Sequence, residues 1–485
     1  MSTTLAQSYQ LSPFLEESPG VSVCVFGFMG PLWFFLSCLL VVTGAASLPP
    51  GKELEPELSP VYFDVHHGHG SLSPDAGESA VSFLDVLAHD ENRIRVLTRR
   101  IAHSKGRKSA PAARNSTRGL VGPQAVSTPV SSGLSIGSGN YYVKVGLGSP
   151  AKYYSLILDT GSSLSWLQCE PCIISCHAQV DPIFNPSASK TYKTLSCSTS
   201  QCLNLKEATL NEPLCESQTG KCIYTASYGD SSFSIGYLSQ DFLSLSPSES
   251  FPNFIYGCGQ DNEGLFGRSA GIIGLARQKL SLLSQLSPRY GYAFYYCLPT
   301  ATSSSSGGGY LAIGKASVSA SAYKFTPMIT NPSVQSLYFL RLVGITISGK
   351  AIGVSAGAYN VPTIIDSGTV ITRLPDSVYA ALKQAFVKVI SAKYSQAASY
   401  SILDTCFKGR AKGLSVPQIR MVFQGGADLA LNSLNILVDV DGGRTCLAFT
   451  GGSRIAIIGN HQQQTFSIAY DVSNSRIGFA AGGCR

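Results

Sequence analysis

An apolar run that ends in Asp and is followed by a hydroxyl residue, a glycine and a second hydroxyl residue occurs twice in this chain. The first copy is Leu156–Ser162 and the second is Thr363–Thr369, and no other Asp-[Ser/Thr]-Gly is present. Either copy alone is typical of an ordinary turn after a buried strand. The pair predicts two similar strand–turn units, each of which presents one aspartate.

The residue types in these units are those that a pair of cooperating carboxylates requires. A buried Asp is costly unless its oxygens accept hydrogen bonds, and a glycine permits the tight turn that brings amide N–H groups to them. Two carboxylates held close together cannot both ionise, so they share one proton and can activate a water molecule. We therefore predict Asp159 and Asp366 as catalytic residues. Their predicted supports are Thr160, Gly161, Ser162, Ser367, Gly368 and Thr369.

Composition favours a turn-rich β protein of two lobes. The 485 residues are 44% hydrophobic and only 13% charged, with 48 Gly and 25 Pro, which argues against coiled coil and disorder. The formal net charge is +7, but no arginine-rich or aromatic-interleaved stripe indicates obligatory nucleic-acid binding. One helix is expected after the second Asp motif, at Ser377–Ser391.

The N-terminal region is typical of a signal peptide followed by a propeptide. Residues 21–47 are almost wholly apolar and end in small residues, which predicts a signal peptide over 1–47, with a signal anchor as the alternative. Because no Lys or Arg precedes this stretch, Met29 is a candidate start. Residues 48–130 read as a propeptide that contains an amphipathic helix near Ser82–Leu97, with Leu84, Leu87, Ile94 and Leu97 at helical spacing. Asn115 is the predicted glycosylation site, inside this propeptide.

Twelve of the 14 cysteines fall between Cys169 and Cys484, an even number that fits six disulfides. The spacing of Cys169, Cys172 and Cys176 resembles a metal-ligand set, but no matching second pair follows. Disulfides are therefore favoured over zinc, and no metal or other cofactor is expected. Oxidised cysteines and a signal peptide together predict the secretory route, to the extracellular space (apoplast) or vacuole rather than the chloroplast.

At the two Asp motifs the sequence resembles the pepsin-like aspartic proteases, over about residues 139–485. Trp166 matches the family's tryptophan behind the flap, and Tyr228 with Gly229 matches the flap that closes over bound peptide. Gly271–Leu275 and Ile457–Asn460 match the segments that cradle each Asp. The resemblance implies an all-β, two-lobed fold with pseudo-two-fold symmetry, lobes at 131–330 and 331–485, and a monomeric endopeptidase that acts on proteins or peptides.

Within that family the chain is similar to the plant nepenthesin-like branch, which carries a cysteine-rich insertion before the flap. The resemblance implies Cys406–Cys446 and Cys297–Cys484 pairs, with other pairs among Cys169, Cys172, Cys176, Cys197, Cys202, Cys215, Cys222 and Cys258. The branch also contains non-catalytic inhibitors of glycoside hydrolases and a chloroplast nucleoid DNA-binding protease. These relatives leave two alternatives open: an inhibitor without protease activity, or a protease with an added DNA-binding role.

Overall fold

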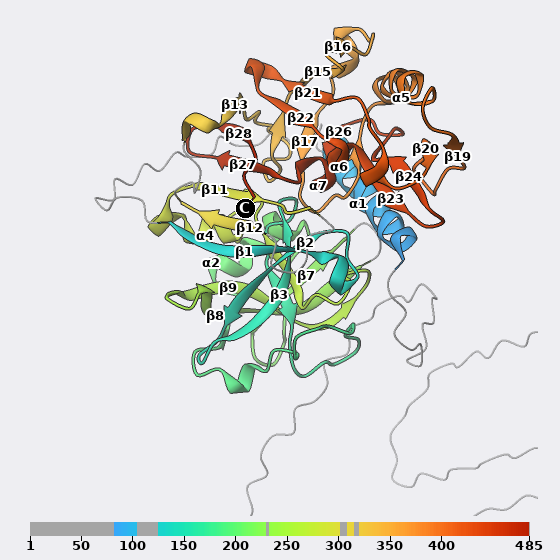
Figure 1. Cartoon of the computed structure of the whole chain (residues 1–485). Coiled ribbons are helices and arrows are strands. Elements are labelled where there is room, and N and C mark those ends of the chain that lie inside the picture. Colours follow the sequence, from blue (N-terminus) through green and yellow to red (C-terminus); the bar gives the residue numbers. More distant parts are fainter. Residues whose placement is uncertain (1–81, 104–124, 229–231, 301–307, 315–319, 485) are drawn as a thin grey trace, which may run out of the picture. The chain divides into compact units, whose positions relative to one another are not determined.

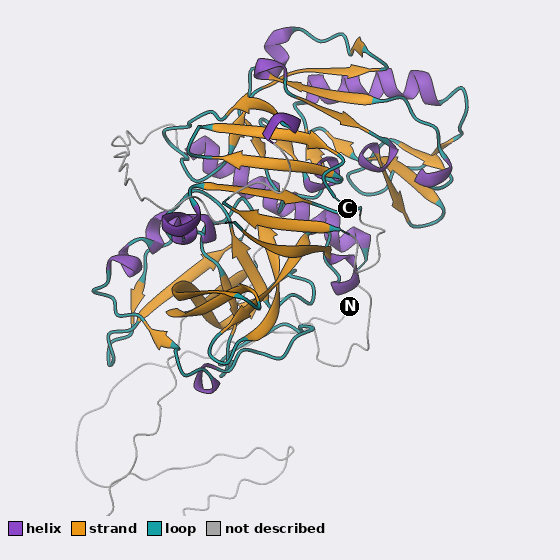
Figure 2. Ribbon diagram, turned by 60° about the vertical axis from the view of Figure 1, so that its left-hand side comes forward, coloured by secondary structure: helices purple, strands orange, loops and turns teal. Residues whose placement is uncertain are grey.

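The computed structural model describes residues 82–103, 125–228, 232–300, 308–314 and 320–484, all of which belong to one compact unit, Gly68–Arg485. The predicted signal peptide, the candidate start at Met29, the sequon at Asn115 and the flap residue Gly229 lie outside the described residues. Strands make up most of the secondary structure from residue 125 onwards, as Figure 2 shows in orange. This confirms the mainly-β prediction.

One large sheet contains strands from both halves of the chain (Figure 1). It is continuous between the halves because β11, from the first half, pairs antiparallel with β27, from the second. In order, its strands are β13 (Lys324–Pro327), β28 (Arg476–Ala481), β27 (Phe466–Asp471), β11 (Ala293–Cys297), β12 (Gly309–Ile313), β1 (Val126–Ser132), β2 (Tyr141–Leu147), β3 (Lys152–Asp159), β10 (Gly271–Gly274), β4 (Trp166–Gln168), β9 (Glu249–Glu263), β8 (Phe233–Ser246), β7 (Cys222–Ser227) and β6 (Leu214–Cys215), with β5 (Lys193–Thr194) beside β8.

Three smaller sheets belong to the second half. The first holds β14 (Phe339–Leu340), β17 (Thr363–Ile365), β26 (Ala456–Ile458), β18 (Thr372–Arg373) and β25 (Phe449–Thr450). The second holds β16 (Lys350–Ala351), β15 (Leu342–Ile347), β21 (Ile419–Phe423) and β22 (Asp428–Leu431), and the third holds β19 (Gln396–Ala397), β20 (Cys406–Lys408), β24 (Arg444–Leu447) and β23 (Leu437–Val440).

The same three-strand unit occurs once in each half and explains the predicted pseudo-symmetry. In the first half β10 lies parallel to β3 and antiparallel to β4. In the second half β26 lies parallel to β17 and antiparallel to β18. β3 ends at Asp159, and Asp366 follows β17 directly, so each unit delivers one aspartate from a buried strand.

Seven α-helices are described, and two of them are informative about sequence prediction. The helix expected at Ser377–Ser391 is α5 (Asp376–Ile390), whereas α4 (Leu282–Tyr290) was not predicted, because Pro288 interrupts its helical pattern. Ser281 caps α4 through a hydrogen bond to the Ser284 amide. The other helices are α1 (Phe83–His103), α2 (Ser200–Leu203), α3 (Leu205–Thr209), α6 (Ser433–Ile436) and α7 (Asn460–Gln463).

The helix predicted near Ser82–Leu97 is α1, which is longer than its sequence pattern indicates, and its buried face differs in part from the predicted one. Leu87, Ile94 and Leu97 are buried as expected, but Leu84 is 47% exposed. Val86 and Ile101 are buried instead. The apolar side of α1 packs on the second half of the chain, in one cluster with Val370, Ile371 and Tyr400 and in another with Leu337, Phe339 and Ile457. No helix among the described residues is long and apolar enough to cross a membrane.

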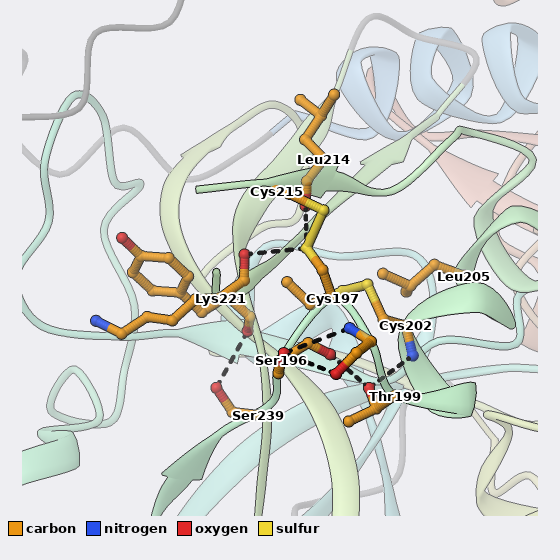
Figure 3. The surroundings of a disulfide bond; sticks show 12 residues. Ser196, Cys197, Thr199, Cys202, Leu205, Leu214, Cys215, Lys221 and Ser239 are labelled. Atoms are coloured by element: carbon orange, nitrogen blue, oxygen red, sulfur yellow. Dashed lines mark hydrogen bonds between the residues drawn. A yellow bond between two sulfur atoms is a disulfide. The ribbon is translucent and has the colours of Figure 1, made fainter. Parts of the chain in front are cut away.

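All twelve cysteines between Cys169 and Cys484 are disulfide-bonded. Cys297 pairs with Cys484 and Cys406 with Cys446, the two pairs expected from the family resemblance. The pairs that the sequence left open are Cys169–Cys258, Cys172–Cys176, Cys197–Cys215 and Cys202–Cys222. Figure 3 shows two of these pairs side by side at the start of α2, where Thr199 caps the Cys202 amide. Cys169, Cys172 and Cys176, whose spacing resembles a metal-ligand set, are thus all disulfide-bonded.

Loss of the Cys406–Cys446 bond should destabilise the fold more than loss of Cys172–Cys176. The first closes a separation of 40 residues and the second a separation of 4, and chain entropy then gives about 4 and about 2 kcal/mol of stabilisation. Urea unfolding of the two double Cys→Ser variants measures both free energies. Equal losses, or a larger loss for Cys172–Cys176, would contradict this expectation.

Candidate active site

The two Asp-containing turns, one from each half of the chain, meet in the interior of the fold, where both aspartates are 1% exposed. The Gly161 amide donates to Asp159 Oδ1 at 2.9 Å and the Gly368 amide to Asp366 Oδ1 at 3.4 Å. The Thr369 hydroxyl donates to Asp366 Oδ2 at 2.6 Å. The Ser162 hydroxyl contributes to lowering the pKa of Asp159, but its Oγ does not reach hydrogen-bond geometry. The second carboxylate is therefore held more firmly by its own loop than the first.

Close packing between the two loops requires glycine at both turns. A Cβ on Gly161 would lie 2.8 Å from Asp366 Oδ1, and one on Gly368 would lie 2.5 Å from Asp159 Oδ1. Atoms at these distances overlap. Each glycine therefore makes room for the carboxylate of the opposite loop, in addition to permitting the turn itself.

The predicted hydroxyl residues also connect the loops. The Thr160 amide donates to Ser367 Oγ at 3.1 Å, and the Ser367 amide donates to Thr160 Oγ1 at 2.9 Å. The Ser367 hydroxyl in turn donates to the Leu158 carbonyl at 2.9 Å. These reciprocal bonds fix the register of one loop on the other, so they hold the two aspartates side by side.

Tyr228 lines the site, and Trp166 supports it from behind. Trp166 is fully buried, and its indole N–H donates to the Tyr228 hydroxyl at 2.7 Å. Phe266 packs edge-on against both rings, with centroids at 5.0 and 5.5 Å. Tyr228 follows β7 directly and lines the same pocket as Asp159. The ring is therefore positioned over the pocket by a buried aromatic cluster.

α1 occupies the space between the two halves of the site. Arg93 donates to Asp159 Oδ1 at 2.6 Å and Oδ2 at 3.4 Å, and to Asp366 Oδ2 at 2.9 Å and Oδ1 at 3.0 Å. One guanidinium thus binds both carboxylates in the forked geometry that suits it. Arg100, further along the same helix, donates to the Gly161 carbonyl at 3.2 Å and to Ser336 Oγ at 2.9 Å.

The pKa shifts of the buried charged groups reflect the contact between α1 and the two aspartates. Burial alone would raise the pKa of Asp159, but the Arg93 charge and the surrounding donors lower it below its usual value. Burial lowers the pKa of Arg93, and the two carboxylates more than reverse that effect, so it is raised. Burial and the nearby Arg93 charge lower the pKa of Arg100 to about 10. With α1 in place, the Arg93 cation therefore favours the ionised form of Asp159.

A second contact anchors α1 one helical turn before Arg93. Asp90 is fully buried, and its carboxylate accepts from the Val370 amide at 2.6 Å, the Ile371 amide at 3.1 Å and Arg373 Nη2 at 2.9 Å. Glu91 also pairs with Arg373 Nη2, at 2.7 Å. Burial is the main cause of the raised pKa of Asp90. Sequence inspection indicated a helix here but gave no role to these charged residues, since their partners lie hundreds of positions away.

Comparisons with known proteins agree on one family. Residues 141–315 match the family described as xylanase inhibitor N-terminal, and residues 337–481 match xylanase inhibitor C-terminal. An aspartyl protease family protein of Arabidopsis thaliana is 41% identical over 440 residues, 89% of each chain. Nepenthesin-2 of Nepenthes gracilis is 37% identical over 75% of this chain and 82% of its own.

The chain belongs to the plant pepsin-like aspartic protease family.

Solved structures confirm the fold of this family member. Basic 7S globulin from soybean superposes with a TM-score of 0.59, covering 74% of this chain and 96% of its own at 22% identity. The predicted two-lobed pepsin-like fold is therefore confirmed. Among the described residues, no group of three or more His, Cys, Asp or Glu side chains is arranged to hold a metal ion.

Proposed function

We propose that this chain is an aspartic endopeptidase made as an inactive zymogen. The observation that carries the proposal is the pair of buried aspartates, Asp159 and Asp366, presented by equivalent loops and bridged by one arginine of a preceding helix. Similarity to proteins named aspartyl proteases supports the same reaction class. Arg93 occupies the position that water and substrate need, which supports an inactive full-length form.

After α1 leaves, the two carboxylates would share a single proton. The ionised member would act as general base on a water molecule, and the protonated member would donate to the carbonyl oxygen of the scissile peptide bond. The backbone and hydroxyl donors around each Asp then hold the charge as it moves between the two carboxylates. Tyr228, positioned by Trp166, would cover the bound peptide.

Release of α1 is best placed before Val126. β1 pairs with both β2 and β12, so cleavage inside it would disrupt a strand of the large sheet.

The protein would pass through an oxidising compartment of the secretory route, in keeping with six disulfides. The extracellular space and the vacuole are the destinations we propose.

A non-catalytic inhibitor of glycoside hydrolases is the second candidate, because the matching family is described by xylanase inhibitors. The two candidates differ in one measurement. The processed protein, incubated with a peptide library between about pH 3 and pH 7, should cleave peptides in a manner that pepstatin blocks. Tight xylanase binding without any cleavage would reject the protease and favour the inhibitor.

Docking of α1 should weaken in acid. The pKa of Asp159 is lowered while Arg93 is bound, whereas the free pair of carboxylates holds a shared proton. Docking therefore releases a proton: it is strongest above the free pair's upper pKa and is lost as the pH falls through the docked pKa of Asp159. The pKa of Asp90 is raised in the docked state, which acts in the opposite direction. We expect the catalytic pair to dominate, because sharing a proton raises the pKa of the free pair while docking lowers the pKa of Asp159.

Hydrogen exchange measured over seconds, before processing, tests this pH dependence. Corrected for intrinsic rates, the protection of α1 amides should fall by at least about tenfold between roughly pH 7 and pH 3. α5 serves as an internal control because it lies outside this contact, and its protection should stay constant. Constant protection of α1 across this range would be evidence against proton-linked docking.

A further inference from the structure

The carboxylate of Asp90 lies in a fully formed anion site that belongs to the protease part of the chain. Two consecutive backbone amides, of Val370 and Ile371, and the Arg373 guanidinium converge on it at 2.6, 3.1 and 2.9 Å. Such charge-assisted bonds are short and strong. Only the carboxylate comes from α1, while all three donors remain when α1 is released.

Arg373 depends on α1 for its counter-charges. Its side chain is 1% exposed, and both ion pairs that the described residues give it, with Asp90 and Glu91, are made by α1. Its Nε and Nη1 atoms are buried and have no hydrogen-bond partner among the described residues. A guanidinium that loses these two carboxylates in a largely enclosed site is destabilised. After departure of α1, another anion bound at the same place would therefore be strongly favoured.

The site lies within reach of a bound peptide. Asp90 and Arg93 are three residues apart on α1, which corresponds to about 4.5 Å along a helix axis, and Arg93 contacts the two aspartates directly. An extended peptide advances about 3.3 Å per residue. A substrate side chain one to about three residues from the scissile bond therefore reaches the donors that Asp90 occupies before release.

We propose that Arg373, with the amides of Val370 and Ile371, forms a subsite that selects an aspartate or glutamate side chain of the substrate. Asp90 occupies this subsite in the uncleaved chain as a substitute for that side chain. The inference rests on the proposed function, since it assigns a specificity to the same cleft. The preferred substrates would be peptides that carry an aspartate or glutamate near the scissile bond.

The test compares matched peptides that differ only by Asp against Asn, or Glu against Gln, at each position within about three residues of the scissile bond. The processed wild-type protein is assayed at about pH 5, where acidic side chains are mostly ionised. We expect one position at which the acid raises kcat/KM at least about tenfold, mainly through KM. In Arg373→Gln the ratio should fall to near one while the amide peptide is still cleaved, and Arg373→Lys should keep part of the preference.

Arg420→Gln is the matched control, because Arg420 pairs with Asp428 outside the cleft; it should retain the wild-type ratio. Equal rates for acid and amide peptides in wild type overturn the inference whether or not the Arg373 variants fold, and leave the proposed function standing. A preference that persists in Arg373→Gln overturns it as well, since another residue must then select the acid. No cleavage of any peptide by the wild type overturns the proposed function, and this inference with it.

Discussion

Replacing Asp159 or Asp366 with asparagine is expected to nearly abolish peptide cleavage by the processed protein, with a loss of about 10²- to 10⁴-fold in kcat. Asparagine has nearly the same shape and still accepts a hydrogen bond, as from the Gly161 or Gly368 amide. It cannot share the proton or activate water, so the chemical step is lost while the loop geometry is kept. The measurement is hydrolysis of a peptide that wild type cleaves, with circular dichroism as the check on folding.

Asp404→Asn is the control for the catalytic variants. Asp404 forms an exposed pair with Lys383, with 45% of its own side chain accessible, and its replacement should leave cleavage unchanged within about twofold. Residual activity above a few per cent in either Asp159→Asn or Asp366→Asn would remove that residue from the proposed mechanism.

Replacing Arg93 with alanine is expected to make the full-length chain active before any processing. Four hydrogen bonds from one guanidinium to two buried carboxylates are lost, and breaking a buried pair of this kind costs about 3–5 kcal/mol. The free energy of α1 docking falls by that amount, and the carboxylates can then take up their shared proton. We expect the initial rate of the unprocessed chain to rise at least about 100-fold over wild type.

The rate must be measured before a shortened chain appears on a gel, since processing alone would also produce activity. Arg95→Ala is the matched control, because Arg95 is an exposed residue of the same helix and its removal tests for an effect of helix propensity alone. An Arg93→Ala chain that stays inactive until it is cleaved, or an equal activation in Arg95→Ala, would show that Arg93 does not hold the site closed.

The sequence is most informative where function is encoded over a few adjacent residues. The two Asp motifs and the apolar-apolar-glycine segments each specify a strand and its turn, so their arrangement around Asp159 and Asp366 follows from local chemistry. The structure also brings Trp166 and Tyr228 together at this site. The pairs Cys297–Cys484 and Cys406–Cys446 were accessible through the family resemblance.

Contacts between remote segments were not accessible in the same way. The charged face of α1 looks like any solvated helix face, and nothing local distinguishes Arg93 from Arg95 or Arg99. The partners of Arg93 lie 66 and 273 residues away, and their position depends on a fold that a single sequence does not specify. The four cysteine pairs of the first half were open for the same reason, because spacing does not determine connectivity.

The packing of α1 has a consequence for how the protein is made. Its apolar side completes two clusters of the second half, around Ile371 and around Ile457, so the chain that folds has a larger core than the chain that remains after release. A processed molecule that unfolds must rebuild these clusters without the segment that covered them. If α1 is released as we propose, we expect the processed protein to be protected mainly by a slow rate of unfolding, so that its lifetime is a kinetic property.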